Sequence, residues 1–237
     1  MAVAFSGGTD STFLLKVAVD TLGSENVIAL TASSPLNPKG ERLNASVLAE
    51  EMGVARHIIV HTPDIKDRRI KHNPEDRCYH CKNEILSTFL DILKKDLGGG
   101  YVLMEGTNRD DLGEHRPGRR AVKELGVISP LTDLTKEEIR EHSRALGLSN
   151  WDRPSQSCLA TRIPHGCELL EEGLIRVDKG ETFLKELGFK ECRLRIHGEL
   201  ARVEVPRSDR SLFLEHSNTI VPALKELGFA HVTMDVE

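Results

Sequence analysis

The segment Ser6–Ser11 constrains the fold of this chain more than any other feature of its sequence. It reads Ser-Gly-Gly-Thr-Asp-Ser and lies between the apolar run Val3–Phe5 and an apolar stripe at helical spacing that begins at Phe13. Two glycines let the backbone approach an anion closely, and the free amides at a helix start point at that anion. The sequence therefore predicts a phosphate-binding loop between a first strand and a first helix.

The side chains of this loop favour ATP as the ligand. Ser6 and Ser11 can add hydroxyl donors, whereas Asp10 is a poor phosphate ligand by charge and is expected to bind Mg²⁺ or to order the loop. A Gly-Gly pair alone would indicate only a tight connection, and no Gly-Lys-Ser/Thr triplet of a Walker A loop occurs. The predicted ATP contacts here are Ser6, Gly7, Gly8, Thr9, Asp10 and Ser11.

Hydrophobic periodicity predicts strands alternating with helices through the first half of the chain. Further strands are expected at Val27–Thr31, His57–Val60 and Tyr101–Met104, with a helix that ends at Gly98–Gly100. Thr135–Glu138 has the pattern of a capping box that opens another helix. This alternation is typical of an α/β fold with a parallel sheet and crossover helices.

The pattern becomes irregular around Pro154 and Pro164, and we place a domain boundary after Gly166. The predicted domains are residues 1–166 and residues 167–237. The second reads helix, strand, strand, helix, strand, with a turn at His197–Glu199, and is expected to be a small α+β domain.

Two further segments fit a nucleotide site by their position. Thr31 follows the second predicted strand, and Gly106, Thr107 and Asn108 follow the fourth. Open α/β sheets bind ligands at the carboxyl ends of their strands, so these residues are predicted ATP contacts. The alternative is an ordinary polar loop.

Charge and cysteine usage restrict the partners and the location. The net charge of −5 argues against a nucleic acid as the main partner, and no signal peptide or membrane span is recognisable. The number of cysteines is odd, five, which indicates thiols or ligands in a reducing compartment rather than disulfides. We expect a cytoplasmic protein with no membrane partner.

Three of these cysteines form the most informative pattern after the phosphate loop. Cys78-Tyr79-His80-Cys81 precedes a helix through Leu86, and Cys158 lies between two prolines. The pattern allows zinc with His80, His165 or Cys167 as a further ligand, a redox pair, cluster ligands, or free thiols. A thioredoxin-type helix is not indicated, and three thiolates would leave one iron of a [4Fe–4S] cluster open. Cys192 is expected to be a core thiol and Cys167 a bystander.

The loop Ser6–Ser11 resembles the PP-loop of the N-type ATP pyrophosphatases. That resemblance implies a PP-loop parallel-sheet domain, cleavage of ATP between the α and β phosphates, and formation of a substrate adenylate.

Within that superfamily the chain resembles the LarE family, sulfur transferases of nickel-pincer nucleotide synthesis. The matching pieces are Ser6–Ser11, 73–79, 105–108, 116–118 and 157–162. The resemblance implies the three-cysteine form, in which Cys78, Cys81 and Cys158 bind a [4Fe–4S] cluster and act in catalysis together with Asp10. Its implied substrate is pyridinium-3,5-biscarboxylic acid mononucleotide, a small-molecule nucleotide.

The resemblance also suggests substrate contacts and an assembly. Arg116, Arg162 and Arg195 are implied substrate contacts, although Arg195 shares a strand face with Arg193 and His197 that could simply be solvated. The second domain is implied to bind substrate and to mediate a homo-oligomer, a hexamer in this family. The sequence departs from the family pattern at both ends: it starts almost on the first strand, without the helix that usually precedes it, and stops at Glu237, where relatives usually continue into a tail with another phosphate-binding arginine.

Three alternatives stay open. A tRNA thiolase shares the PP-loop and three cysteines but needs a tRNA-binding face, which the charge does not suggest. An ammonia-dependent synthetase of the NAD-synthetase type would not need Cys78, Cys81 and Cys158. A zinc-stabilised nucleotide-binding module would bind ATP without releasing pyrophosphate.

Overall fold

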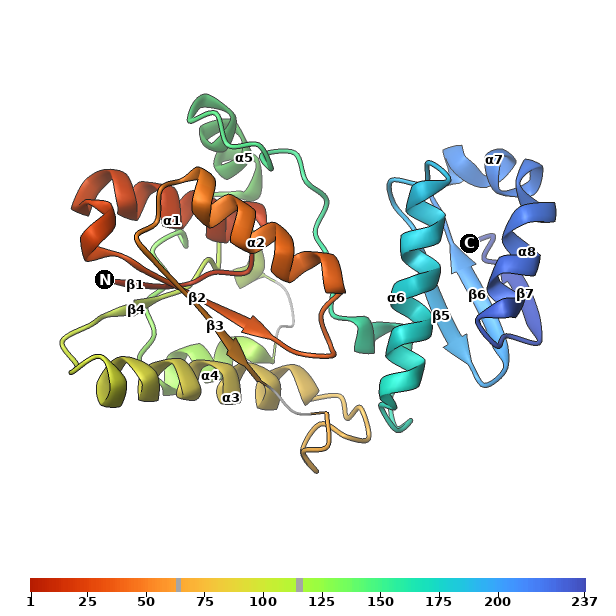
Figure 1. The fold of residues 1–237 in the computed structure, drawn as a ribbon, viewed down its shortest axis with the longest axis horizontal. Helices are drawn as coiled ribbons and strands as arrows, with labels where there is room; N and C mark the ends of the chain where they lie inside the picture. Colours follow the sequence, from red (N-terminus) through yellow and green to blue (C-terminus); the bar gives the residue numbers. More distant parts are fainter. Residues whose placement is uncertain (63–64, 114–116) are drawn as a thin grey trace. The chain divides into compact units, whose positions relative to one another are not determined.

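The computed structural model describes residues 1–62, 65–113 and 117–237, and its contacts divide the chain into two compact units (Figure 1). The N-terminal unit consists of Met1–Arg69 and Glu75–Gln156. The C-terminal unit consists of Ile70–Pro74 and Ser157–Glu237. The contacts thus assign residues 157–166 to the C-terminal unit, whereas the sequence-based boundary after Gly166 remains a prediction.

A four-stranded parallel sheet forms the centre of the N-terminal unit. Its strand order is β3-β2-β1-β4, from β1 (Ala2–Ala4), β2 (Ile28–Ser33), β3 (Arg56–His61) and β4 (Leu103–Met104). Val3 pairs with Ala29 on one side and with Met104 on the other. The predicted α/β class and the predicted parallel pairing are confirmed.

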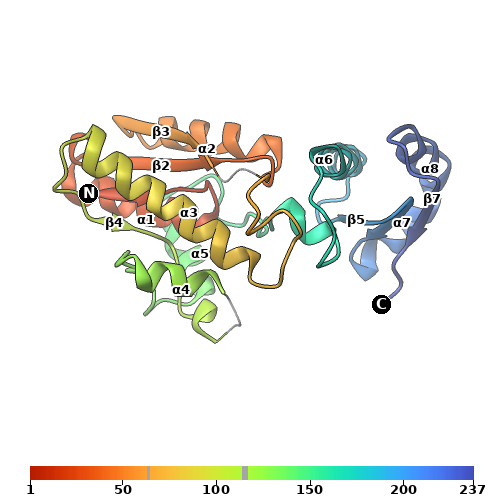
Figure 2. The same ribbon diagram turned by 90° about the horizontal axis from the view of Figure 1, so that it is seen from below.

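Helices cover both faces of this sheet, because successive strand residues point to opposite sides (Figures 1 and 2). The helices of this unit are α1 (Thr9–Leu22), α2 (Lys39–Glu51), α3 (Arg77–Asp91), which continues as the π-helical turn Ile92–Asp96, α4 (Gly118–Glu124) and α5 (Lys136–Ala145), with short 3₁₀ turns at Ser24–Asn26 and Asp110–Leu112. Val3 and Phe5 pack toward α1 and α2, whereas Ala2 and Ile28 pack toward α3 and α4.

The start of α3 differs from the sequence-based expectation. The helix begins at Arg77, so Cys78 and Cys81 lie in its first turns rather than before it. Apolar periodicity marks only the apolar, buried face of a helix, which begins at Leu86 here. The first turns carry polar and thiol side chains, and apart from the buried Arg77 these are exposed or half-buried. The capping box of α5 is confirmed, since Thr135 Oγ1 accepts from Glu138 N and Thr135 N donates to the Glu138 carboxylate.

The C-terminal unit contains a three-stranded sheet, in the order β5 (Arg193–His197), β6 (Leu200–Glu204) and β7 (His231–Met234), and has its own apolar core. The helix α6 (Glu171–Glu186) packs closely on this sheet because residue 180 is glycine: a Cβ there would lie 2.5 Å from Leu194 Cδ2. The predicted order of elements is confirmed, with the second helical region split in two. The elements are the 3₁₀ turn Leu159–Arg162, α6 (Glu171–Glu186), β5 (Arg193–His197), β6 (Leu200–Glu204), the 3₁₀ turn Arg207–Asp209, α7 (Arg210–Glu215), α8 (Ser217–Glu226) and β7 (His231–Met234).

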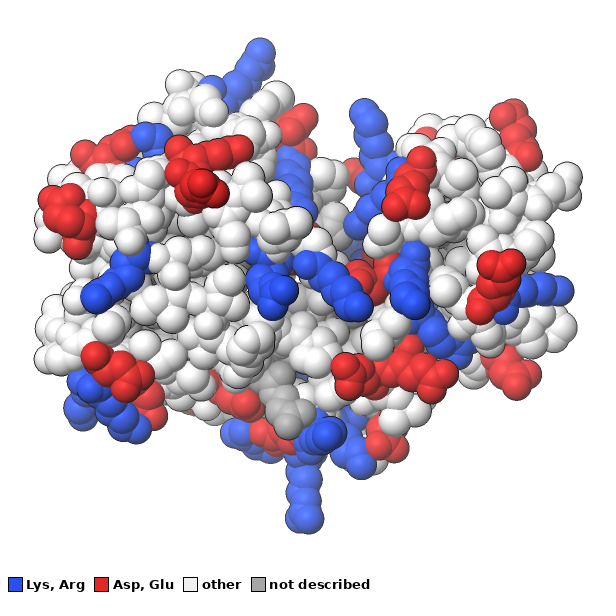
Figure 3. Space-filling view, in the orientation of Figure 1, with Lys and Arg blue, Asp and Glu red and all other residues white. Residues whose placement is uncertain are grey.

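On the face drawn in Figure 3, acidic and basic side chains are intermixed on both units, and uncharged residues make up most of the surface. Among the described residues, no helix has the length and apolar character that crossing a membrane requires.

Candidate functional site

The predicted phosphate loop connects the carboxyl end of β1 to the amino end of α1. Gly7 has φ +77°, and a Cβ on it would lie 3.1 Å from the Cα of Ala45, so both the backbone conformation and the packing require glycine. Gly8 is the N-cap residue of α1, and no side chain among the described residues caps this helix. The amides of the first turn therefore remain available to an anion, which the helix dipole also attracts.

The two serines of the loop brace its backbone. Ser11 Oγ donates to Gly8 O at 3.1 Å and accepts from Ser6 N at 3.2 Å. Ser6 Oγ accepts from Gly8 N at 3.3 Å and lies 3.1 Å from Ser11 Oγ. These contacts hold the loop in one conformation, and direct contacts of Ser6, Thr9 and Ser11 with ATP remain predictions.

The loop after β4 packs directly against the phosphate loop. A Cβ on Gly106 would lie 3.1 Å from Ser11 N, so only glycine permits this approach without displacement. Thr107 and Asn108 are buried, and Asn108 exchanges two backbone-to-side-chain hydrogen bonds with Asp111, both of 3.1 Å. The carboxyl ends of β1 and β4 thus bring the predicted residues 106–108 to the loop at 6–11.

Asp10 fits a magnesium ligand. Its Oδ1 is buried without a hydrogen-bond partner among the described residues, and its Oδ2 lies 3.7 Å from Lys136 Nζ. Burial raises the pKa of the Asp10 carboxyl, and the nearby carboxylate of Asp111 adds to this effect, whereas Lys136 and Asn108 oppose it. A carboxylate oxygen without a protein donor is a suitable ligand for a hard cation.

Three side chains of this site were missed in the sequence. Asn150 Nδ2 donates to Gly7 O at 3.0 Å and to Thr12 Oγ1 at 2.9 Å, and Asn150 O accepts from Thr9 Oγ1 at 3.0 Å. Arg153 reaches Gly7 O at 3.5 Å, and Lys136 lies beside Asp10. The loop Ser6–Ser11 contains no lysine or arginine. This absence could have indicated that the positive charge near a bound polyphosphate comes from side chains elsewhere in the chain.

Thr31 is buried in the carboxyl-terminal half of β2, and its hydroxyl contacts β3 and the residue that follows β1. Thr31 Oγ1 donates to Phe5 O at 2.7 Å and therefore accepts from His57 Nε2 at 2.8 Å. Burial lowers the pKa of His57, which favours the neutral ring. The predicted contact of Thr31 with ATP remains a prediction.

The C-x-x-C pair lies on one face of α3, because residues three apart in a helix are neighbours. Cys78 is exposed and accepts from Arg77 Nη2 at 3.5 Å, and Cys81 is half-buried. Lys82, the next residue, donates to Glu105 Oε2 at 2.6 Å. Burial alone would raise the pKa of Glu105, but the charge and hydrogen bond of Lys82, with hydrogen bonds from Ser129 and Thr107, lower it.

Cys158 belongs to the C-terminal unit and caps the 3₁₀ turn Leu159–Arg162. We call Ser157–Gly166 the Cys158 segment. Arg162 is buried and forms a two-pronged ion pair with Glu181, Nε–Oε1 2.7 Å and Nη2–Oε2 3.0 Å. Its Nη1 donates to Ser157 O at 3.2 Å and to Cys158 O at 3.5 Å. Convergence of Cys158 with Cys78 and Cys81 remains a prediction.

The two predicted substrate arginines of the C-terminal unit both hold the Cys158 segment. Arg195 Nη1 donates to Thr161 O at 2.8 Å, and its other nitrogens bind the Glu204 carboxylate. Burial alone would raise the pKa of Glu204, but the hydrogen bonds and charge of Arg195 lower it. Because all three nitrogens of Arg162 already have protein acceptors, the geometry favours a positioning role for it, and its contact with substrate remains a prediction.

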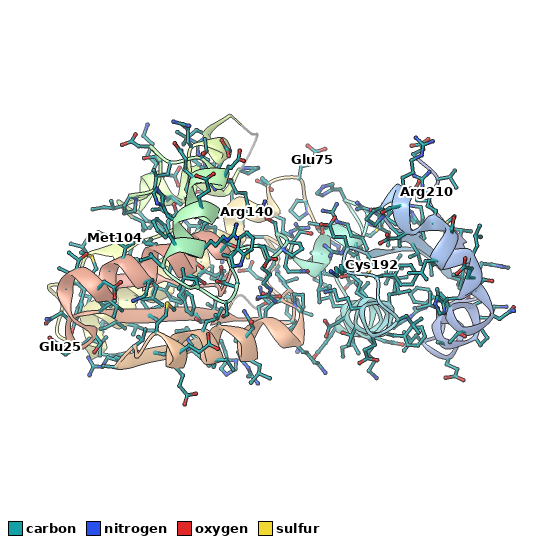
Figure 4. All side chains as sticks on the ribbon, turned by 90° about the horizontal axis from the view of Figure 1, so that it is seen from above. Glu25, Glu75, Met104, Arg140, Cys192 and Arg210 are labelled. Atoms are coloured by element: carbon teal, nitrogen blue, oxygen red, sulfur yellow. The ribbon has the colours of Figure 1, made fainter. Side chains whose placement is uncertain are left out.

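The remaining predicted residues are placed as follows. Cys192 is partly buried, packs against the apolar core of the C-terminal unit and lies beside α6 (Figure 4), and burial raises its thiol pKa to about 11. Cys167 is exposed. Arg116 lies outside the described residues. Within the ranges 1–62, 65–113 and 117–237, no group of three or more His, Cys, Asp or Glu side chains is gathered as for a metal ion.

Comparison with known proteins places these features in context. A family model described as NAD synthase matches residues 1–83, which contain the phosphate loop. The pyridinium-3,5-bisthiocarboxylic acid mononucleotide synthase of Lactiplantibacillus plantarum is 36% identical over 239 residues, covering 100% of this chain and 85% of that protein. An uncharacterised protein of Synechocystis sp. is 41% identical over 239 residues, covering 99% of this chain and 88% of that protein.

The similarity to NAD synthetases is shorter. The NH₃-dependent NAD⁺ synthetase of Methanococcoides burtonii is 30% identical over 159 residues, which cover 62% of this chain and 56% of that protein. The match to the mononucleotide synthase therefore spans both units, and the match to the NAD synthetase does not extend over the whole chain.

Proposed function

The chain belongs to the LarE family of PP-loop enzymes, and on this premise we propose that it is an ATP-dependent sulfur transferase acting on a pyridinium carboxylate mononucleotide. The observation that carries the proposal is the match over the whole chain to a synthase of a bisthiocarboxylic acid mononucleotide. A thiocarboxylate is a carboxylate in which sulfur has replaced oxygen. The enzyme must therefore activate a carboxylate and deliver sulfur to it.

The proposed activation step is adenylation. A carboxylate oxygen of the substrate attacks the α-phosphorus of ATP, the new O–P bond forms, and pyrophosphate leaves. We propose that the amides at the start of α1 bind this pyrophosphate and that Asp10 holds Mg²⁺ against it. Lys136 supplies positive charge beside the loop, whereas Arg153 also forms an ion pair with Glu41 at 2.7 Å. Asn150 and Arg153 both donate to the Gly7 carbonyl.

The proposed second step transfers sulfur. A sulfur nucleophile attacks the adenylated carboxyl carbon, the C–S bond forms, the C–O bond to the phosphate breaks, and AMP leaves with the bonding electrons. Adenylation makes this possible because AMP is a far better leaving group than an oxide ion.

We propose that Cys78, Cys81 and Cys158 bind a [4Fe–4S] cluster. The two thiols on one face of α3 and the third on a braced turn suit a set of three thiolate ligands. When bound by three protein thiolates, such a cluster has one iron free to carry the sulfide that is transferred. Arg162 and Arg195 hold the turn that presents Cys158.

We further propose a cytoplasmic homo-oligomer, a hexamer by the resemblance to the LarE family. The exposed thiols Cys78 and Cys167 suit a reducing compartment.

The test is anaerobic reconstitution with iron and sulfide, followed by incubation with ATP, Mg²⁺ and the biscarboxylic acid mononucleotide. We expect release of pyrophosphate and AMP and a product in which one oxygen is exchanged for sulfur, read by mass spectrometry. Cys158→Ser should release pyrophosphate without forming this product, and Cys167→Ser should do both. A colourless protein that holds stoichiometric zinc would contradict the cluster proposal.

The match of the NAD synthase model to residues 1–83 supports one other candidate, an ammonia-dependent synthetase. Such an enzyme also adenylates a carboxylate, but nitrogen is the nucleophile. Unchanged amide formation from ammonia after Cys78, Cys81 and Cys158 are all replaced by alanine would favour it.

A further inference from the structure

The carbonyl oxygen of Gly7, in the phosphate loop, accepts hydrogen bonds from side chains of the N-terminal unit. Asn150 Nδ2 donates to it at 3.0 Å, Asn44 Nδ2 at 3.4 Å and Arg153 Nη1 at 3.5 Å. No backbone N–H among the residues that the structure describes donates to it. The bond from Asn150 is the shortest of the three and is buried, so Asn150 contributes most to the direction in which this carbonyl points.

The same side-chain amide also supports the next peptide of the loop. Asn150 Nδ2 donates to Thr12 Oγ1 at 2.9 Å, and that hydroxyl in turn donates to Gly8 O at 2.9 Å. Thr9 Oγ1 donates to the backbone carbonyl of Asn150 at 3.0 Å. Both hydrogens of one amide group therefore act on the two peptides that connect Gly7 to Gly8 and Gly8 to Thr9.

The direction of the Gly7 carbonyl determines the direction of the Gly8 amide. In a trans peptide the C=O of one residue and the N–H of the next point in opposite directions. Gly7 O lies in the interior, and Gly8 N–H makes an exposed, long hydrogen bond of 3.3 Å to Ser6 Oγ. A phosphate oxygen is a charged acceptor and forms a stronger bond with such an amide than a hydroxyl does. Because Gly7 and Gly8 have no Cβ, sterics restrict this peptide little, and its orientation depends on the groups that bind it.

The environment of Asn150 is not arranged for stability alone. The residue is 5% exposed, and its Oδ1 is buried without a hydrogen-bond partner among the described residues. An unpaired buried oxygen costs free energy, which an apolar side chain of similar shape would not. The gain from asparagine at this position lies in its two N–H groups, and both are directed at the phosphate loop.

We propose that Asn150 is a positioning residue for ATP, which turns the Gly7 carbonyl into the protein and so points the Gly8 amide at the β and γ phosphates. The inference rests on the proposed function, because it takes Ser6–Ser11 as the loop that binds the pyrophosphate part of ATP. Asn150 acts through the loop backbone and not on the reacting atoms.

The preceding residue provides a matched control. Ser149 Oγ donates to Glu51 Oε2 at 3.0 Å, across 98 positions of the chain, but this bond is exposed and does not involve the phosphate loop. Ser149→Ala therefore removes a long-range hydrogen bond of the same segment and leaves the Gly7 carbonyl bound to Asn150.

The experiment uses the full chain and compares Asn150→Leu, Asn150→Ala and Ser149→Ala with the parent. Leucine has the same branching at Cγ and removes both the N–H donors and the unpaired oxygen without adding charge. Alanine does the same without added bulk, and it decides the matter if the leucine variant does not fold. Gly7 O keeps Asn44 and Arg153 as donors in both variants, so it is not left unpaired. Circular dichroism and urea unfolding establish which variants are folded.

The readout is the dissociation constant of three ligands, ATP, inorganic pyrophosphate and AMP, measured by isothermal titration with Mg²⁺ present. AMP lacks the β and γ phosphates and reports on the rest of the nucleotide site. We expect each folded Asn150 variant to bind ATP and pyrophosphate at least about ten-fold more weakly, the effect of losing one hydrogen bond to a charged ligand, and to bind AMP as the parent does. Ser149→Ala should match the parent for all three ligands.

The outcomes separate the positioning role from the proposed function. An unchanged ratio of ATP to AMP affinity in a folded Asn150 variant overturns the positioning role, whether both affinities hold or both fall, and a purely structural role would make both fall. Sulfur transfer by the parent would then leave the proposed function standing. A parent that binds neither ATP nor pyrophosphate overturns the positioning role together with the phosphate loop. ATP affinity that depends on Asn150 in a parent that transfers no sulfur supports the positioning role and contradicts the proposed function.

Discussion

Lys82 Nζ lies 2.6 Å from Glu105 Oε2, and this ion pair joins the helix that contains Cys78 and Cys81 to the loop that follows β4. Glu105 also accepts from Thr107 N at 3.1 Å and from the Ser129 hydroxyl. One buried carboxylate thus orders the backbone of the predicted nucleotide loop and holds the residue next to Cys81. Within the N-terminal unit, the contact therefore links the loop that is predicted to bind ATP to the helix that carries two of the three cysteines.

We expect Lys82→Met to lower the free energy of unfolding by about 1–2 kcal/mol, because it leaves a buried carboxylate without its cation. The expected loss of unfolding free energy is small because the Lys82 side chain is 35% exposed and water replaces part of the interaction. Urea unfolding monitored by circular dichroism measures it. Lys95→Met, which removes an exposed pair with Asp91, is the control and should leave the midpoint in place. Equal midpoints for both variants would refute the role of Lys82.

The same pair predicts a dependence of stability on pH. The pKa of Glu105 is lowered from its ordinary value of 4.5, so its contribution is present above pH 4.5 and is lost as the pH falls through the lower folded pKa. We expect the stability difference between the parent and Lys82→Met to shrink as the pH falls below 4.5. Urea midpoints measured from pH 7 downward test this, and a difference that grows on acidification would contradict it.

Asp10→Asn should separate stability from function. Burial raises the pKa of Asp10 above its ordinary value of 3.8, so the carboxylate destabilises the folded state at neutral pH, and this cost disappears toward and below pH 3.8. We expect the variant to unfold at a higher temperature than the parent at pH 7 without Mg²⁺, with the difference vanishing in acid. Mg²⁺-dependent pyrophosphate release should fall about 100-fold. A variant that is less stable than the parent at pH 7 would contradict the conclusion that the buried, charged carboxylate destabilises the folded state.

Gly7→Ala and Gly99→Ala form a matched pair. Both glycines have positive φ, +77° and +79°, but a Cβ on Gly7 would meet Ala45 Cα at 3.1 Å whereas one on Gly99 meets nothing within 4 Å. We expect Gly99→Ala to cost about 1 kcal/mol from the backbone alone. Gly7→Ala should cost about 1–3 kcal/mol more because of crowding, and it should also weaken ATP binding. Urea unfolding and isothermal titration with ATP read the two effects, and equal losses would exclude the crowding argument.

Arg162→Met should destabilise the protein by about 3–5 kcal/mol, because Glu181 would remain buried and unpaired. Both side chains of this pair are at most 3% exposed, so solvent cannot compensate. The double variant Arg162→Met/Glu181→Met should recover most of this loss, since the uncompensated charge is then absent. Additive losses in a double-mutant cycle by urea unfolding would show that the two residues do not act as a pair.

The local features of this chain could be read from its residues because each depends on neighbours in the sequence. The Gly-Gly turn at residues 7 and 8, the capping box at Thr135 and the turn at His197–Glu199 between two strands are all confirmed by the structure. The helix α3 starts earlier than the sequence indicated, because its first turns carry polar and thiol side chains and show no apolar stripe. Turn, cap and strand signals reflect the backbone conformation of a few consecutive residues. They predict the structure correctly where these local preferences determine it.

The α/β class, the loop between β1 and α1 and the residue types available for sulfur chemistry follow from the sequence alone. Three long-range contacts exist only once the chain is folded: Asn150 donates to Gly7 across 143 positions, Lys82 to Glu105 across 23, and Asn73 to Ala160 across 87. The residues that make these contacts are polar and follow no periodic pattern in the sequence. The chain contains many similar polar side chains, so the sequence does not show which two will form a hydrogen bond. Their pairing follows from the packing of strands and helices, which brings distant segments together and makes an unsatisfied buried polar group costly.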